Sequence, residues 1–190
     1  MPTPMGIGAL FIQRDLHERI EPLVYGGGQQ QNLRSGTLPV ALCVGMGAAA
    51  AVLSTDDAGG EREALRDRRD RFVQALSGLP WSIKSNGPET KDRHPGNVNL
   101  AFGGFSAHEI LGALQPHVAA STGSACTSGI PEPSHVLRAI GLDGDDADAS
   151  IRFSLGRGTT DADIEDAVGI IGKVLSELAR ADLMRSAQEA

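Results

Sequence analysis

Hydrophobic and polar residues alternate in two stretches of the chain, residues 98–102 and 150–155, with the period of a half-buried strand. In the second stretch Ile151, Phe153 and Leu155 share one face. We expect two short strands in the same region, at 81–85 and 118–120. We also expect two helices there. One begins at Ser106, with Glu109 as the partner in its capping box, and the other begins at Ser134.

Two longer helices are expected on either side of these strands. Residues 61–76 place Leu65, Phe72 and Leu76 on one side, with arginines elsewhere. A second helix follows Thr160, which occupies an N-cap position. Its apolar stripe consists of Ile164, Val168, Ile171, Leu175 and Leu178. Helices that shield short strands in this order predict an α/β fold.

The first sixty residues have a different pattern. An apolar run at 8–12 predicts a buried strand, and a glycine-rich loop at 26–36 follows it. We expect a helix that begins with Thr37 as its N-cap and Pro39 in its first turn, and that ends near Leu53.

Turn-forming residues at 56–60 mark a boundary between these two parts. We therefore expect a first segment at 1–60, a compact α/β domain at 61–181 and a flexible tail at 182–190. The polar stretch 86–95, which contains two prolines, predicts an exposed loop.

Composition excludes several classes of protein. The net charge is −7 and no run of five or more Lys or Arg residues occurs, which argues against a nucleic-acid or anionic-membrane surface. No run of about 18 apolar residues and no signal-peptide pattern is found, so a cytoplasmic protein without membrane contacts is expected. The two cysteines lie far apart and the histidines lack metal-ligand spacing, so no metal site is predicted.

Cys126 is the stronger candidate for chemistry. It lies in a loop of small residues, Ser-Thr-Gly-Ser-Ala-Cys-Thr-Ser-Gly at 121–129, where hydroxyls and backbone N–H groups are able to stabilise a thiolate. The alternative is a small residue that fills a turn. Cys43 falls on an apolar helix, where an inert, packed thiol is expected.

Arg152 is the second candidate. It projects from the strand face opposite Ile151 and Phe153. An arginine fixed on a strand suits two-pronged binding of a carboxylate, although a plain surface arginine has the same pattern. The glycine-rich loop with Arg34, just before a helix, is a weaker candidate for binding an anion.

Several segments in order closely resemble the NifS-like (group I) cysteine desulfurases of the class V aminotransferase family, which are pyridoxal phosphate enzymes of fold type I. Two carry the most specific motifs, Ser-Ala-Cys-Thr-Ser-Gly at 124–129 and Ile-Arg-Phe-Ser-Leu-Gly-Arg at 151–157. Four more match in family order, at 6–12, 25–29, 33–40 and 132–138.

The resemblance implies a role for each candidate residue. Cys126 takes sulfur from L-cysteine as a persulfide and leaves L-alanine, and Arg152 holds the substrate carboxylate. Thr37 reaches across a homodimer to the cofactor phosphate of the partner subunit. It also implies a sulfur acceptor, either an iron–sulfur scaffold or a tRNA-thiolation enzyme, and a remnant of the large domain with a connecting helix at 1–60.

The match also has gaps. In the family, a His-Lys pair lies just before the segment that matches 6–12, and its lysine bonds the cofactor. Lys84, Lys91 and Lys173 are the lysines of this chain, and none follows a histidine. Gln30-Gln31 stand where the family often has Glu-Arg. The expectation is the C-terminal half of a desulfurase that works with a lysine-bearing complement; the alternatives are a non-enzymatic persulfide-relay or interaction module and an inactive fragment.

Overall fold

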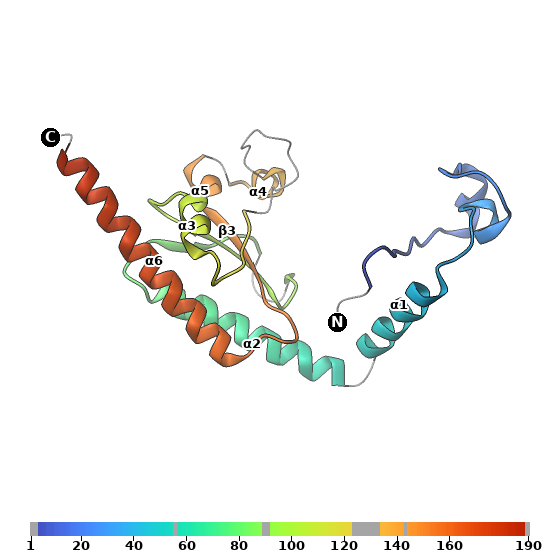
Figure 1. The fold of residues 1–190 in the computed structure, drawn as a ribbon, viewed down its shortest axis with the longest axis horizontal. Coiled ribbons are helices and arrows are strands. Elements are labelled where there is room, and N and C mark those ends of the chain that lie inside the picture. The colour runs from blue at the N-terminus through green and yellow to red at the C-terminus, as the bar shows by residue number, and fades with distance from the viewer. Residues whose placement is uncertain (1–3, 55–56, 89–91, 123–133, 143, 189–190) are drawn as a thin grey trace. The chain divides into compact units, whose positions relative to one another are not determined.

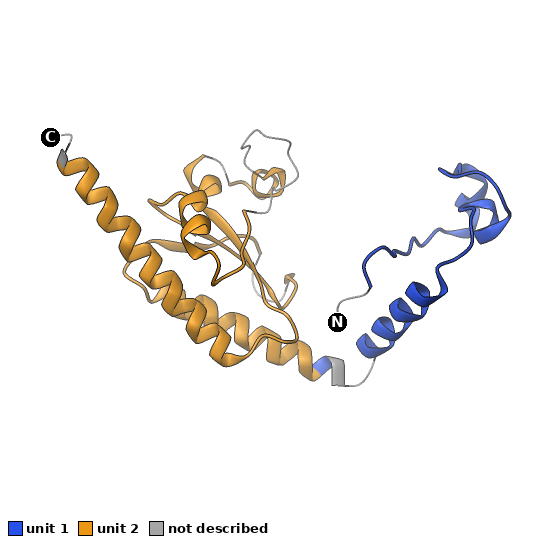
Figure 2. Cartoon of the chain, in the orientation of Figure 1, with its two compact units in different colours: residues 1–59 blue, residues 60–190 orange. Residues whose placement is uncertain are grey.

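The computed structural model describes residues 4–54, 57–88, 92–122, 134–142 and 144–188. They form two compact units, Met1–Gly59 and Gly60–Ala190 (Figure 2). Across the described ranges, no helix combines the length and the apolar character that crossing a membrane requires.

A three-stranded antiparallel sheet forms the centre of the second unit. Its strands are β1 (Ile83–Ser85), β2 (Asn97–Phe102) and β3 (Ser150–Ser154), in the order β1-β2-β3. The other edge of β3 carries a single bridge from Ser121 to Arg152, in place of the strand predicted at 118–120.

Three helices enclose a core on one face of this sheet: α2 (Asp57–Ser77), α3 (Ala107–Leu114) and α6 (Asp161–Gln188). In the view of Figure 1, α2 and α6 lie below the sheet. Among the core residues with almost no exposed surface are Phe72, Leu76, Leu100, Ile151 and Leu175. The apolar stripes that the sequence predicts on the two long helices therefore face the core.

The ends of these helices differ in part from the prediction. Thr160 caps α6, since its hydroxyl accepts a hydrogen bond from the Asp163 N–H (3.2 Å) and the Asp163 carboxylate accepts from the Thr160 N–H (2.7 Å). Ser106 makes no capping bond to α3. Its expected partner Glu109 lies 3.7 Å from Arg185 instead. Arg185 also lies 2.5 Å from Asp182, and α6 continues to Gln188, past the residue 181 at which the sequence pattern predicted its end.

Two short helices complete the second unit, α4 (His135–Ala139) and α5 (Asp145–Asp148). The Ser150 hydroxyl donates to the Asp146 carbonyl at 2.6 Å, which ties α5 to the start of β3. α2 begins at Asp57, earlier than the sequence pattern indicates.

The first unit contains two 3₁₀ segments, η1 (Arg14–Arg19) and η2 (Gln29–Asn32), and the helix α1 (Val40–Leu53). The strand predicted at 8–12 is wrong, since this segment is irregular and no strand of the unit, as far as it is described, lies beside it. A strand needs a neighbour for its backbone hydrogen bonds. The N-cap of α1 is Pro39 and not Thr37, with no side-chain capping bond.

Candidate functional site

Arg152 lies on the open face of the sheet. It is exposed between the buried residues Ile151 and Phe153, as the strand period predicts. The backbone at Arg152 has a neighbour on each side. On one side Asn99 of β2 is opposite Arg152 in the strand register, and on the other side Ser121 exchanges two backbone hydrogen bonds with Arg152, at 2.6 and 3.1 Å. The guanidinium is therefore carried by a backbone that is fixed on two sides.

The guanidinium of Arg152 has no hydrogen-bond or ion-pair partner among the residues that the structure describes. Most other arginines of the second unit are paired; Arg68 and Arg71, for example, both bind Asp161. An exposed, unpaired guanidinium on a rigid strand is suited to bind a carboxylate or another anion.

Cys126 belongs to the segment 123–133, which lies outside the described residues. The two ends of this segment are described. At one end is the Ser121 bridge to Arg152, and at the other is Ser134, which is buried and occupies the N-cap position of α4. The structure thus joins the start of the Cys126 loop directly to Arg152.

A buried hydrogen-bond network lies beside Arg152. The Asn86 side-chain amide donates to Asn99 Oδ1 at 2.7 Å and to the Ser150 hydroxyl at 2.8 Å, and Ser150 donates in turn to the Asp146 carbonyl. Asn86 and Ser150 are 8% and 1% exposed. The prediction of an exposed loop at 86–95 is therefore wrong for Asn86. The period of β2 could have placed Asn99 on the face of Arg152, but no sequence signal marks Asn86.

Thr37 lies in the other unit and is exposed. The loop before it is held by Ser35, whose hydroxyl donates to the Gly27 carbonyl at 2.8 Å, and by the Gly36 N–H, which donates to Gln29 at 3.1 Å. Gly36 has a φ of +103°, a backbone conformation that favours glycine. The loop is therefore shaped by specific local bonds and presents the Thr37 hydroxyl just before α1.

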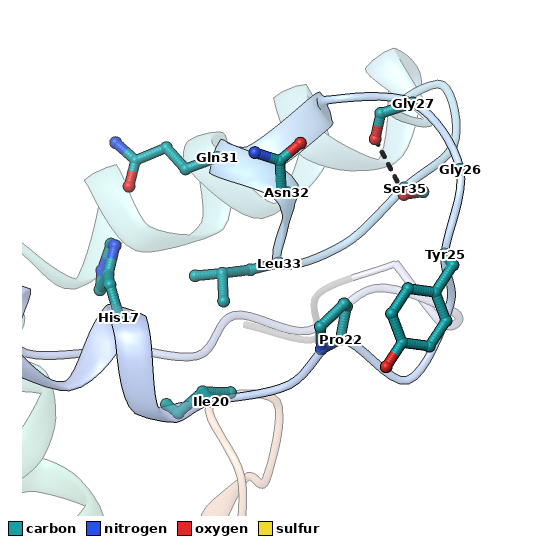
Figure 3. A pocket seen from close by; sticks show the side chains of 10 residues that line it. All are labelled: His17, Ile20, Pro22, Tyr25, Gly26, Gly27, Gln31, Asn32, Leu33 and Ser35. Carbon is teal, nitrogen blue, oxygen red and sulfur yellow. Dashed lines mark hydrogen bonds between the residues drawn. The ribbon is translucent and has the colours of Figure 1, made fainter.

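A hollow of about 310 Å³ lies beside this loop, between residues 17–27 and 31–35, and Figure 3 shows the residues that line it. His17, Tyr25 and Asn32 are among its lining residues, and Thr37 is not. The hollow contains no lysine or arginine side chain, so it offers no full positive charge to a phosphate.

Cys43 lies on α1 and is half-buried. Within the described ranges, no group of three His, Cys, Asp or Glu side chains is arranged to hold a metal ion.

Three comparisons place the chain among known proteins. Residues 1–166 match the family described as aminotransferase class-V. The chain is 40% identical over 175 residues to the "Cysteine desulfurase IscS" of Rickettsia bellii, which covers 92% of this chain and 42% of that protein. It is 42% identical over 175 residues to the "Cysteine desulfurase" of a Frankia strain, covering 90% of this chain and 41% of that protein.

Solved structures show the same relationship. A "NIFS-LIKE PROTEIN" superposes with a TM-score of 0.71 at 25% identity, over 83% of this chain and 39% of that chain. The NifS-like protein of Rickettsia africae superposes with a TM-score of 0.68 at 25% identity, over 82% of this chain and 40% of that chain. The chain thus spans about two fifths of the length of the relatives it matches. Its fold is that of the NifS-like enzymes of fold type I, and the chain belongs to the aminotransferase class-V family.

Proposed function

We propose that this chain is part of a cysteine desulfurase that removes sulfur from L-cysteine, releases L-alanine and carries the sulfur as a persulfide on Cys126. The observation that carries the proposal is the guanidinium of Arg152, which is exposed and has no partner among the described residues, on a backbone that is hydrogen-bonded to Ser121 at the start of the Cys126 loop. The names of the similar proteins support the same reaction.

Arg152 binds the carboxylate of L-cysteine in this proposal. A guanidinium offers two parallel N–H donors that match the two oxygens of a carboxylate. Since its strand is fixed on both sides by Asn99 and Ser121, little freedom of the backbone is lost on binding. Arg152 thereby orients the substrate relative to the loop that begins at Ser121.

Cys126 receives the sulfur. It lies five positions after Ser121, and five residue steps span at most about 18 Å, so the chain length keeps Cys126 within about 18 Å of Ser121, which is bonded to Arg152. The Cys126 thiolate forms a sulfur–sulfur bond with the substrate while the carbon–sulfur bond of the substrate breaks. The carbon keeps the electron pair of that bond and takes up a proton, which gives alanine.

Enzymes of this family depend on pyridoxal phosphate, which supplies the electron sink that makes the carbon–sulfur bond breakable. The residues of the chain fit one part of this group. The exposed Thr37 hydroxyl, next to Gly36 and just before α1, suits a hydrogen bond to a phosphate. We infer that Thr37 makes this contact with the cofactor of a second subunit.

The described lysines do not fit the covalent bond to the cofactor. Lys84 is exposed and lies 3.3 Å from Asp146, and Lys173 is exposed beside Glu177 at 3.9 Å. A lysine that bonds a carbonyl must be neutral at working pH, which requires burial or a neighbouring cation. We therefore assign that bond to neither Lys84 nor Lys173, and Lys91 lies outside the described residues.

We propose three further points on the strength of the family resemblance. Residues 1–60 are a part of the large domain with its connecting helix, and residues 61–181 are the small domain that carries the Cys126 loop. The enzyme acts as a homodimer or with a complementing half. Its persulfide passes to an acceptor protein, either an iron–sulfur scaffold or a tRNA-thiolation enzyme.

A complementation experiment tests the function. The chain is mixed with a polypeptide that contains the His-Lys segment of a related desulfurase, pyridoxal phosphate and L-cysteine, and alanine and the mass of the chain are followed. We expect alanine to form in the mixture and not with the chain alone, and one extra sulfur atom to appear on the chain. Cys126→Ser should abolish the added sulfur, and the matched variant Cys43→Ser should retain it. Persulfide on the Cys126→Ser chain would contradict the assignment.

A further inference from the structure

Asn99 stands directly across from Arg152 in the register of β2 and β3. Residues that are opposite in an antiparallel pair share a face, and their Cβ atoms lie about 4.5–5.5 Å apart. Val98 and Leu100, the neighbours of Asn99, are buried in the core on the other face. The Asn99 amide and the Arg152 guanidinium therefore belong to one polar surface.

The hydrogen-bond network fixes which end of the Asn99 amide faces inward. The Asp146 carbonyl only accepts, so the single hydroxyl proton of Ser150 is donated to it at 2.6 Å. Ser150 must then accept from Asn86 at 2.8 Å, which identifies the Asn86 atom as the amide nitrogen Nδ2. The same nitrogen lies 2.7 Å from Asn99, whose atom there must be the accepting oxygen Oδ1.

As a consequence, the Asn99 nitrogen Nδ2 is on the branch of the amide that points away from the network. It has no hydrogen-bond partner among the residues whose placement is known. Asn86 also fixes the orientation of the Asn99 amide. Asn86 is buried, donates both of its side-chain amide protons within the network, and donates its backbone N–H to the Asn99 carbonyl at 2.9 Å.

We propose that Asn99 is a second donor for the substrate carboxylate beside Arg152, so that the site selects a free α-carboxylate. This inference rests on the proposed function, in which Arg152 binds that carboxylate. A carboxylate has about four lone-pair positions, and a guanidinium fork occupies two of them. The Asn99 amide donates to a third lone-pair position of the carboxylate. Because the amide is neutral, it does not form an ion pair with the Arg152 guanidinium in place of the substrate.

The test is a titration of the complete 190-residue chain, labelled with ¹⁵N, with L-alanine. L-Alaninamide, which lacks the carboxylate, is the control ligand. We expect alanine to shift the Asn99 side-chain NH₂ signals and the Arg152 Nε–H signal along one saturation curve. Alaninamide should shift neither. These signals report contact with the ligand and do not respond to a purely structural role of the network.

Two variants with the same chemical change separate local contact from surface charge. Asn99→Asp keeps an oxygen toward Asn86 but replaces the outward donors by a negative charge, and we expect it to weaken alanine binding by about tenfold or more. Asn97→Asp places the same charge on the same face, opposite Ser154, and we expect about twofold at most. Both variants should keep the urea midpoint of the parent chain.

The outcomes distinguish this inference from the proposed function. If the parent chain does not bind alanine, the inference about Asn99 is refuted, while the proposed function is decided by the complementation experiment. If Arg152→Lys binds alanine as well as the parent does, the carboxylate site is refuted and both fall. If Arg152→Lys weakens binding while the Asn99 signals stay unmoved and Asn99→Asp binds normally, only the role of Asn99 is refuted. Should Asn99→Asp fail to fold, the Asn99 signals of the parent chain decide alone.

Discussion

The two units of this chain bury their apolar residues to very different extents. In the second unit, Phe72, Leu100 and Ile151 are at most 2% exposed and belong to one closed core. In the first unit, Ala49 and Ser35 are the buried residues of the described part, while Leu10, Phe11 and Leu23 are more than 80% exposed. The second unit thus contains the core that stabilises it, whereas the described apolar residues of the first unit form no comparable core.

This difference explains why the most rigidly positioned residues of the candidate site lie in the second unit. Arg152 and Asn99 are carried by strands whose other face is the closed core. Thr37 is carried by a loop that local hydrogen bonds shape, with little apolar burial beneath it. A binding group is positioned as precisely as the elements that carry it.

The largest difference in stability is expected between two truncations of an aromatic residue, one in each unit. Phe72→Ala removes a ring that packs edge-on against Phe153 at 5.3 Å, and we expect the free energy of unfolding of the second unit to fall by about 3–5 kcal/mol. Phe11→Ala removes a ring that is 87% exposed, and a change within about 0.5 kcal/mol is expected. Urea unfolding followed by circular dichroism measures both. Equal losses in the two variants would abolish the contrast between the units.

A smaller effect distinguishes the two threonines that precede helices. Thr160→Ala removes the reciprocal bonds with Asp163 at the start of α6, and we expect the free energy of unfolding to fall by about 1 kcal/mol. Thr37→Ala should leave stability unchanged, since α1 has no side-chain cap. In the complemented enzyme, the same Thr37→Ala change should weaken binding of pyridoxal phosphate. A loss of stability in the Thr37→Ala chain would show that this residue has a structural role.

The smallest expected effect is on the stability of the folded chain at low pH, through Asp161. Hydrogen bonds from Arg71 and then Arg68 lower the pKa of Asp161 from its usual 3.8. A carboxyl whose pKa is depressed by folding stabilises the folded state above about pH 4, and this contribution is lost as the pH falls through the lowered pKa. We expect Asp161→Asn to flatten the acid limb of the stability curve slightly, because the group is exposed to solvent. A curve that is identical to that of the parent below pH 4 would contradict a role for this ion pair.

The sequence by itself determined the secondary structure wherever a repeating apolar pattern meets a core. The period of two in β2 and β3 and the stripe from Ile164 to Leu178 predict both the elements and their buried faces. The same period identified Arg152 as a residue of the open face. These features are encoded locally, because the spacing of side chains along a strand or helix fixes which of them point the same way.

Only the tertiary structure decided the features that depend on distant neighbours. The run at 8–12 has the composition of a strand but no strand to pair with in the described unit, and composition alone does not supply hydrogen-bond partners. Arg69 has the sequence context of an exposed helix arginine but is 1% exposed, where it lowers the pKa of Arg93 in addition to the larger effect of burial. The bonds of Asn86 to Asn99 and Ser150 join residues 13 and 64 positions apart, a separation over which no periodic pattern extends, so that only the folded chain brings them together.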